Sequence, residues 1–181
     1  MSGLCKAVLG LSLAVALLML SVLPARAQAQ DDSASVRKFV QEFYDWYAPM
    51  ARQPSSVPAF VVALRKRPAA FSPSLAKALQ DDADAQARVT DDIVGIDWDP
   101  FLNTQDPEAR YAVGEITRSG ETYRVEVRAV RAGQERPKPD VVAEVGGTAG
   151  HWRFVNFHSP DGDDLLRDLA KLKKGREEHH E

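Results

Sequence analysis

The hydrophobic period of this chain changes from helical spacing in its first half to alternation in its second, before a final helix. Val36, Val40 and Phe43 recur at steps of four and three residues, which is typical of an amphipathic helix. From Tyr123 to Ala129 apolar residues instead alternate with charged ones, which indicates a strand with one buried and one solvated face. A chain with both periods must combine helices with a sheet, and we expect an α+β domain.

Capping residues and turn residues place the other elements. Besides the helix that ends near Gln53, helices are predicted over residues 58–66, from the N-cap Ser72 towards Arg88, and from Asp163 onwards. Strands are predicted over residues 110–118, 123–129, 141–145 and 151–158. Short links between consecutive strands predict a curved four-stranded antiparallel sheet, with the N-terminal helices packed on one face and a C-terminal helix added. The last strand has Trp152 and Phe154 on one face and Val155 and Phe157 on the other, so it should be central or covered.

The first 27 residues have the pattern of a secretory signal peptide. Lys6 precedes an apolar run from Ala7 to Leu23, and small residues follow at cleavage spacing. Cleavage after Ala27 or after Ala29 is expected, so the mature chain begins at Gln28 or Gln30. The alternative is an uncleaved anchor, but the run is short for a span of about 20 residues.

Cysteine and charge then narrow the classes of function. Cys5 lies before the apolar run, whereas a lipoprotein needs its cysteine directly after it, so no stable membrane anchor is expected. The mature chain lacks cysteine, which excludes disulfides, thiolate metal sites and a cysteine nucleophile. Removing the leader changes the net charge from −3 to −5, which disfavours nucleic-acid binding. We expect a periplasmic or secreted protein with one domain over residues 28–174 and a charged tail over residues 175–181.

The stretch Gly95 to Glu108, GIDWDPFLNTQDPE, is rich in carboxylates around a few apolar side chains. Asp97 and Asp99 would share one side of an extended segment, where a close pair can act as acid and base or hold a cation with Asn103 and Asp106. The calcium-loop pattern fails, because Phe101 stands at the third ligand position and no glycine follows it. The favoured interpretation is structural: Asx side chains bond nearby backbone N–H groups while Trp98, Phe101 and Leu102 are buried.

Aromatic residues of the first helix offer a second candidate site. Tyr44, Trp46 and Tyr47 form a broad stripe, which favours core packing over a ligand cavity with inward phenols. Asp45 lies about 200° around the helix from Phe43, so it should be solvated.

The sequence gives little support for a histidine metal site, a serine nucleophile or a phosphate-binding loop. His151 and His158 are an odd number of residues apart on one strand, so they should face opposite sides, and His179-His180 reads as solvated. No G-x-S-x-G occurs, and the glycine run from Gly146 to Gly150 reads as a hairpin turn. No catalytic residue, metal or cofactor is predicted.

Three stretches carry a resemblance to a known family. They are FYDWY at residues 43–47, DWDPFLNTQD at residues 97–106 and WRFVNF at residues 152–157. In order and spacing they resemble a bacterial family of secreted proteins and lipoproteins, domain of unknown function 3828, over nearly the whole mature chain. That family looks similar to the cone-shaped cystatin-like and nuclear transport factor two-like folds, which can hold a pocket between helices and sheet. The resemblance implies such a cone in a free periplasmic form, and no established activity.

Two classes of function follow. The favoured one is a non-catalytic binding or scaffolding module of the cell envelope, which holds a protein, a peptide or a small ligand. The alternative is a small cofactor-free enzyme or ligand carrier that uses an acidic residue in the cone. A homodimer is also compatible with the alternating signs of Arg124, Glu126 and Arg128. The candidate pocket or motif residues are Tyr44, Asp45, Tyr47, Asp97, Asp99, Asn103, Gln105, Asp106, Trp152 and Asn156.

Overall fold

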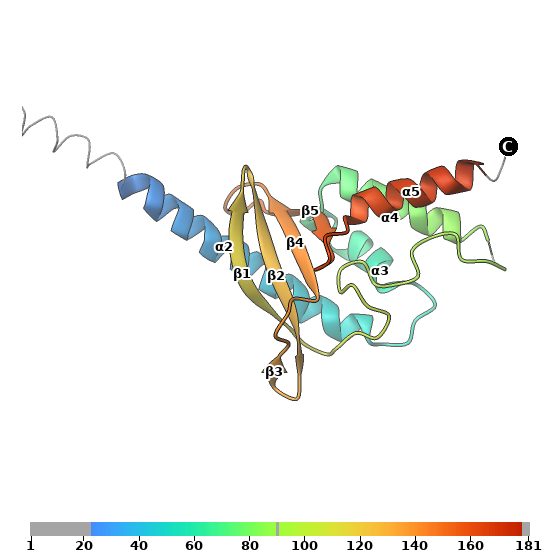
Figure 1. Ribbon diagram of the computed structural model, residues 1–181, viewed down its shortest axis with the longest axis horizontal. Helices are drawn as coiled ribbons and strands as arrows, with labels where there is room; N and C mark the ends of the chain where they lie inside the picture. Colours follow the sequence, from blue (N-terminus) through green and yellow to red (C-terminus); the bar gives the residue numbers. More distant parts are fainter. Residues whose placement is uncertain (1–22, 90, 179–181) are drawn as a thin grey trace, which may run out of the picture.

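The computed structural model describes residues 23–89 and 91–178, which combine helices with an antiparallel sheet (Figure 1). Residues 1–22 of the predicted leader, and His179 and His180, lie outside the described residues. The helices are α2 (Leu23–Ala51), α3 (Ala59–Lys66), the 3-10 helix η1 (Pro68–Ala70), α4 (Pro73–Gln86) and α5 (Leu165–Glu178). The strands are β1 (Tyr111–Ser119), β2 (Thr122–Arg131), β3 (Gln134–Glu135), β4 (Val141–Gly146) and β5 (Arg153–His158). The predicted α+β class is confirmed.

Helix α2 begins earlier than its apolar period indicates. Residues 25–48 contain neither Pro nor Gly, and the first of them are Ala, Arg and Gln, which are good helix formers. Val36, Val40 and Tyr47 are fully buried on one face of this helix, where it contacts β1 and β2. None of the described helices is both long and apolar enough to cross a membrane.

The shorter helices have local causes in the sequence. At the predicted N-cap of α4, the Ser72 hydroxyl accepts a hydrogen bond from the N–H of Leu75 at 3.3 Å, and Pro73 occupies the first turn. Helix α5 continues to Glu178, so residues 175–178, which we predicted to be tail, are helical. This last turn has a tertiary partner, because Arg176 forms an ion pair with Asp82 of α4 at 2.7 Å.

The main sheet has the strand order β1-β2-β4-β5, and each neighbouring pair is antiparallel. Strand β2 follows the predicted alternation, with Tyr123, Val125 and Val127 buried and Arg124 exposed. The structure adds β3 to the four predicted strands, a two-residue strand that pairs with the end of β2.

Strand β5 forms one end of this strand order, and its outer side is covered. Phe71 forms a parallel bridge with Phe154, and helices α4 and α5 contact the strand. The predicted separation of Phe154 and Phe157 onto opposite faces is wrong: both are buried, with ring centroids 5.1 Å apart. A bulge causes this, because Val145 pairs with Phe154 and Glu144 with Asn156, which leaves Val155 as the extra residue.

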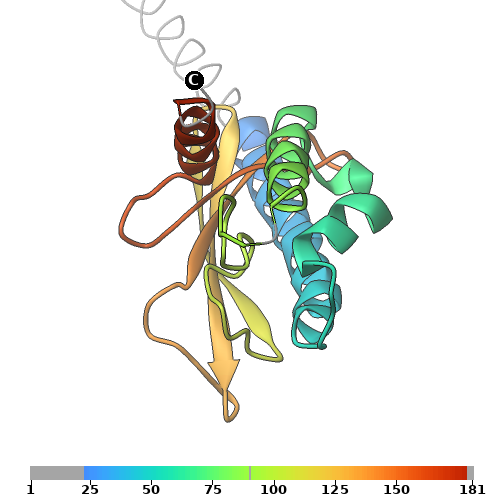
Figure 2. The same ribbon diagram turned by 90° about the vertical axis from the view of Figure 1, so that its right-hand side faces the viewer.

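An aromatic cluster joins the helical layer to the sheet. Phe43 of α2 contacts the rings of Phe71, Phe101 and Phe154, with centroids 4.7 to 5.8 Å apart. Phe101 belongs to the segment between α4 and β1, which passes between the helices and the sheet (Figure 2, yellow-green). The core therefore fixes the middle of this loop, and its flanks remain at the surface.

Candidate functional site

Asp99 is the central residue of the loop from Gly95 to Glu108. Its Oδ1 accepts hydrogen bonds from the backbone N–H groups of Phe101 at 3.0 Å and Leu102 at 3.1 Å. Its own N–H donates to the carbonyl of Thr104 at 2.9 Å. Phe101 and Leu102 are fully buried, whereas Trp98, which was also predicted to be buried, is only half-buried. The prediction that an Asx side chain closes this loop over an apolar anchor is confirmed for Asp99.

A tyrosine from α2 reaches the same carboxylate. The Tyr47 hydroxyl donates to Asp99 Oδ2 at 2.6 Å, while the Tyr44 hydroxyl donates to the carbonyl of Phe101 at 2.8 Å. Both phenols are thus polar handles that fix the loop on the helix, as buried tyrosines commonly are. No Lys or Arg side chain of the described residues pairs with Asp99, so its charge is met by neutral donors only.

Burial changes the acidity of these groups. Desolvation raises the pKa of Asp99 to about 6, although its hydrogen bonds from Tyr47, Phe101 and Leu102 act in the opposite direction. Burial, and then the nearby Asp99 carboxylate, raise the pKa of Tyr47 and of Tyr44 well above the usual value, so both phenols stay protonated donors. An enclosed carboxyl that titrates near neutral pH is a frequent property of binding and catalytic sites.

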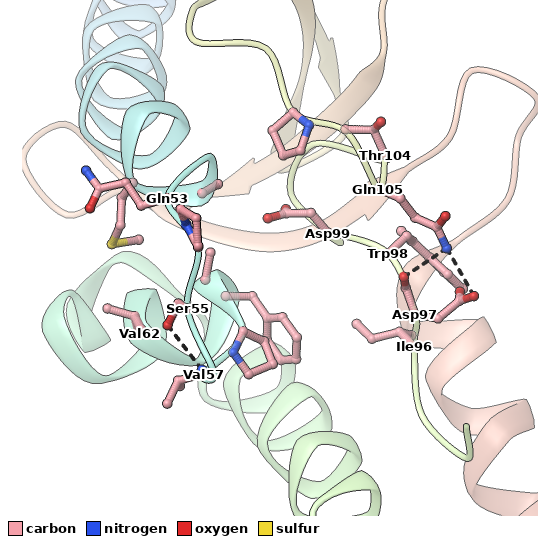
Figure 3. A pocket seen from close by; sticks show the side chains of 17 residues that line it. Gln53, Ser55, Val57, Val62, Ile96, Asp97, Trp98, Asp99, Thr104 and Gln105 are labelled. Carbon is pink, nitrogen blue, oxygen red and sulfur yellow. Dashed lines mark hydrogen bonds between the residues drawn. The ribbon is translucent and has the colours of Figure 1, made fainter. Parts of the chain in front are cut away.

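Asp99 lies in the wall of a pocket of about 550 Å³ (Figure 3). One side of the pocket comes from the end of α2, the connection to α3 and α3 itself; the other comes from the loop around Asp99. Its lining residues are Met50, Ala51, Gln53, Pro54, Ser55, Val57, Pro58, Ala59, Phe60, Val62, Ile96, Asp97, Trp98, Asp99, Thr104, Gln105 and Pro107. The volume falls within the range of small-molecule sites.

Asp97 and Gln105 lie on the same wall as Asp99. Asp97 is exposed, and its Oδ2 and carbonyl both accept hydrogen bonds from Gln105 Nε2 at 3.1 Å (Figure 3). The two carboxylates therefore differ in environment: Asp99 is half-buried and tied to its own loop, and Asp97 is solvated. The predicted close pair does not form, because the Asp99 carboxylate points to the helical side of the pocket whereas the Asp97 side chain points to Gln105 (Figure 3).

The other sequence candidates are placed elsewhere. Asn103 has a positive φ of 51° and donates to the carbonyl of Asp140 at 3.1 Å. Asp106 is exposed, and its N–H donates to the Thr104 hydroxyl at 3.1 Å. Asp45 is exposed as predicted and accepts from Gln41 at 2.8 Å. Asn156 is buried and donates to Asp164 at 2.8 Å. The described residues contain no group of three or more His, Cys, Asp or Glu side chains that could hold a metal ion.

Trp152 lines a second hollow, which lies beside residues 35–42 of α2. This groove of about 670 Å³ is also lined by the basic residues Lys38, Lys66, Arg67 and Arg153, and Glu42 is the one acidic residue among its lining residues. The Trp152 indole N–H is already satisfied, since it donates to the Ser35 hydroxyl at 2.9 Å. The basic groove lacks a half-buried ionisable side chain of the kind found at Asp99, so the Asp99 pocket is the stronger candidate site.

Sequence reasoning missed the apolar half of the Asp99 pocket. Met50, Val57, Phe60 and Val62 come from a segment that we assigned only as a helix end, a connection and a short helix. The sequence carried no clear signal for this half, because a single apolar residue such as Val57 in a polar loop is common.

No family model matches the chain, and no match was found among curated proteins or solved structures.

Proposed function

We propose that this protein is a non-catalytic binding module of the bacterial cell envelope, and that it holds a small ligand in the Asp99 pocket. The observation that carries the proposal is one half-buried carboxylate with a raised pKa in the wall of a pocket whose lining combines apolar side chains with a few polar ones. Pockets with mainly apolar walls and a few fixed polar groups are the usual form of small-molecule sites.

The hydrogen bonds of Asp99 favour binding over catalysis. An ionised carboxylate offers about four lone-pair positions, and Tyr47, Phe101 and Leu102 already occupy three of them. One position on Oδ2 remains, which is enough for a ligand to bind there, and the described residues near it offer no second group that would act as the partner acid. A small cofactor-free enzyme is the second candidate, and the raised pKa of Asp99 is the observation that favours it.

The envelope location rests on the N-terminal sequence. Lys6, the apolar run and the alanines before Gln28 and Gln30 have the pattern of a cleaved leader, and the resemblance to domain of unknown function 3828 agrees with export. Intact mass measurement of the protein from a periplasmic extract is expected to give residues 28–181 or 30–181. A full-length protein in the membrane fraction would overturn this part of the proposal.

Pocket blocking tests the binding function. Ala59 lines the pocket, so Ala59→Trp should fill part of it, whereas Ala149→Trp adds the same side chain at an exposed position outside it. In a ligand-observed NMR screen of a fragment library, we expect fragments that bind the wild type and the Ala149→Trp variant but lose binding to Ala59→Trp. If no fragment shows this pattern while circular dichroism confirms that both variants are folded, the pocket is not a ligand site and the proposal fails.

A further inference from the structure

All ionisable side chains that line the Asp99 pocket are acidic. Two carboxylates, Asp97 and Asp99, belong to its lining, and none of the seventeen residues that line it is Lys, Arg or His. Arg52 is next to Ala51 in the chain, but it is exposed and forms no ion pair with either acid. An anionic ligand would meet only repulsion here, whereas a cation would be attracted.

The free lone pair of Asp99 shows where a cation can bind. Oδ1 accepts two backbone N–H groups, and Oδ2 accepts only the Tyr47 hydroxyl, so one acceptor position on Oδ2 remains. Asp99 is half-buried and also lines the pocket, so this position is less exposed to water than a carboxylate at the open surface. Charge pairing is stronger in such surroundings than at an exposed carboxylate.

The other lining residues indicate the chemistry of the part of the ligand that does not bind Asp99. The lining residues on the helical side include Met50, Val57, Phe60 and Val62. Ile96 and Trp98 belong to the loop side (Figure 3). Aliphatic and aromatic walls favour an apolar body, and an indole also tolerates a nearby ammonium group through its ring electrons. A metal ion fits poorly, because it would find one half-buried carboxylate and apolar side chains in place of several oxygen ligands.

We infer that the ligand of this pocket is a small organic cation, whose ammonium group binds Asp99 Oδ2 and whose apolar body packs between the α3 side of the pocket and Trp98. The inference rests on the proposed binding function and adds the chemical class of the ligand to it. Asp97, at the exposed part of the wall, contributes attraction at longer range and no direct contact.

Matched probes test this assignment. 2-Phenylethylamine, 2-phenylethanol and phenylacetate share an aromatic body and differ in charge, and their dissociation constants can be measured by NMR titration of the exported protein at pH 7.5. We expect the amine to bind at least tenfold more tightly than the alcohol, and phenylacetate to bind more weakly than either. Equal binding of amine and alcohol would overturn the assignment.

Variants locate the charge that matters. Asp99→Asn keeps an oxygen for the loop N–H groups, so it should retain alcohol binding and lose the preference for the amine. Asp97→Asn is the matched control and should change that preference less than threefold. If Asp97→Asn removes the preference and Asp99→Asn does not, Oδ2 of Asp99 is not the binding group.

A pH series provides a test that needs no variant. The ionisable groups near Asp99 are Tyr47 and Tyr44 from α2, Tyr111 from β1 and Asp97 from its own loop, and the three phenols, whose pKa values are raised, stay neutral in this range. With the pKa of Asp99 at about 6, amine binding should weaken about tenfold from pH 7.5 to pH 5, and alcohol binding should not. A flat amine profile contradicts the inference.

The two proposals fail in different ways. If library fragments bind in a pocket-dependent manner but the amine shows no preference, the binding function stands and the ligand class is wrong. If neither the fragments nor the three probes bind, both proposals fail.

Discussion

Two aspartates, one buried and one half-buried, show how this fold accommodates carboxylates that are partly or wholly removed from solvent. Asp82 is only 2% exposed and is paired with the guanidinium of Arg176, so its charge is compensated. Asp99 has no cationic partner among the described residues and relies on two backbone N–H groups and a phenol. Neutral donors leave the desolvation cost of a carboxylate partly uncompensated, which is why the pKa of Asp99 is raised and why its charge remains available to a ligand.

Asp99 should make the free energy of unfolding depend on pH in a characteristic way. The pKa of Asp99 is about 6 in the folded protein against 3.8 normally, so between these values the folded protein holds a proton that the unfolded chain has lost. Its contribution to the free energy of unfolding is therefore greatest below pH 4 and falls by about 3 kcal/mol as the pH rises past 6. Urea denaturation from pH 3.5 to 7.5 should show this fall in the wild type, and Asp99→Asn should lack it.

The difference between the two stability curves isolates Asp99, because the other carboxyl groups titrate in both proteins. Asp97→Asn serves as the control, since Asp97 is exposed and its curve should run parallel to that of the wild type. Parallel curves for Asp99→Asn as well would show that Asp99 is not desolvated in the folded protein.

At the level of elements, the sequence predicted those helices and strands whose apolar residues follow a regular local spacing. Helix α2 and strand β2 each bury one face, so the spacing of Val40 and Phe43 and the alternation from Tyr123 were sufficient. The bulge at Val155 was not predictable, because it depends on how β4 and β5 pair and leaves the local pattern of apolar residues unchanged. The pocket was missed for the same reason: its two walls, residues 50–62 and 96–107, meet only in the folded chain.

The connection between β4 and β5 contains a glycine that no other residue can replace without strain. Gly147 has a φ of +121°, and a Cβ added there would overlap the carbonyl oxygen of His151. Gly147→Ala should therefore lower the free energy of unfolding by about 1 to 3 kcal/mol, measured from urea midpoints. Gly150→Ala is the matched control in the same connection: its φ is also positive, at +83°, but the space around an added Cβ is open. Equal losses for the two variants would mean that backbone conformation, and not the contact with His151, limits this turn.

At the scale of the whole molecule, one ion pair links the C-terminal helix to the pocket. Arg176 of α5 donates to Asp82 Oδ1 at 2.7 Å and to the carbonyl of Val94 at 2.6 Å, and Asp82 Oδ2 accepts the N–H of Ile96 at 2.9 Å. Ile96 is a lining residue of the pocket. A chain end that is remote from Asp99 in sequence is thus coupled by three hydrogen bonds to the loop that carries it.

Removal of this guanidinium should loosen the pocket wall as well as destabilise the fold. Arg176→Met leaves the Asp82 carboxylate buried without its cation, which should cost about 3 to 5 kcal/mol of unfolding free energy. Adding Asp82→Asn removes the buried charge and keeps an acceptor for Ile96, so the double variant should regain part of the loss. Hydrogen exchange under native conditions should then show faster exchange at the amides of Gly95 and Ile96 in Arg176→Met than at β2, where the core is unchanged. If exchange increased equally at both places, Arg176 would contribute only to global stability, and the pocket wall would be held by its own loop alone.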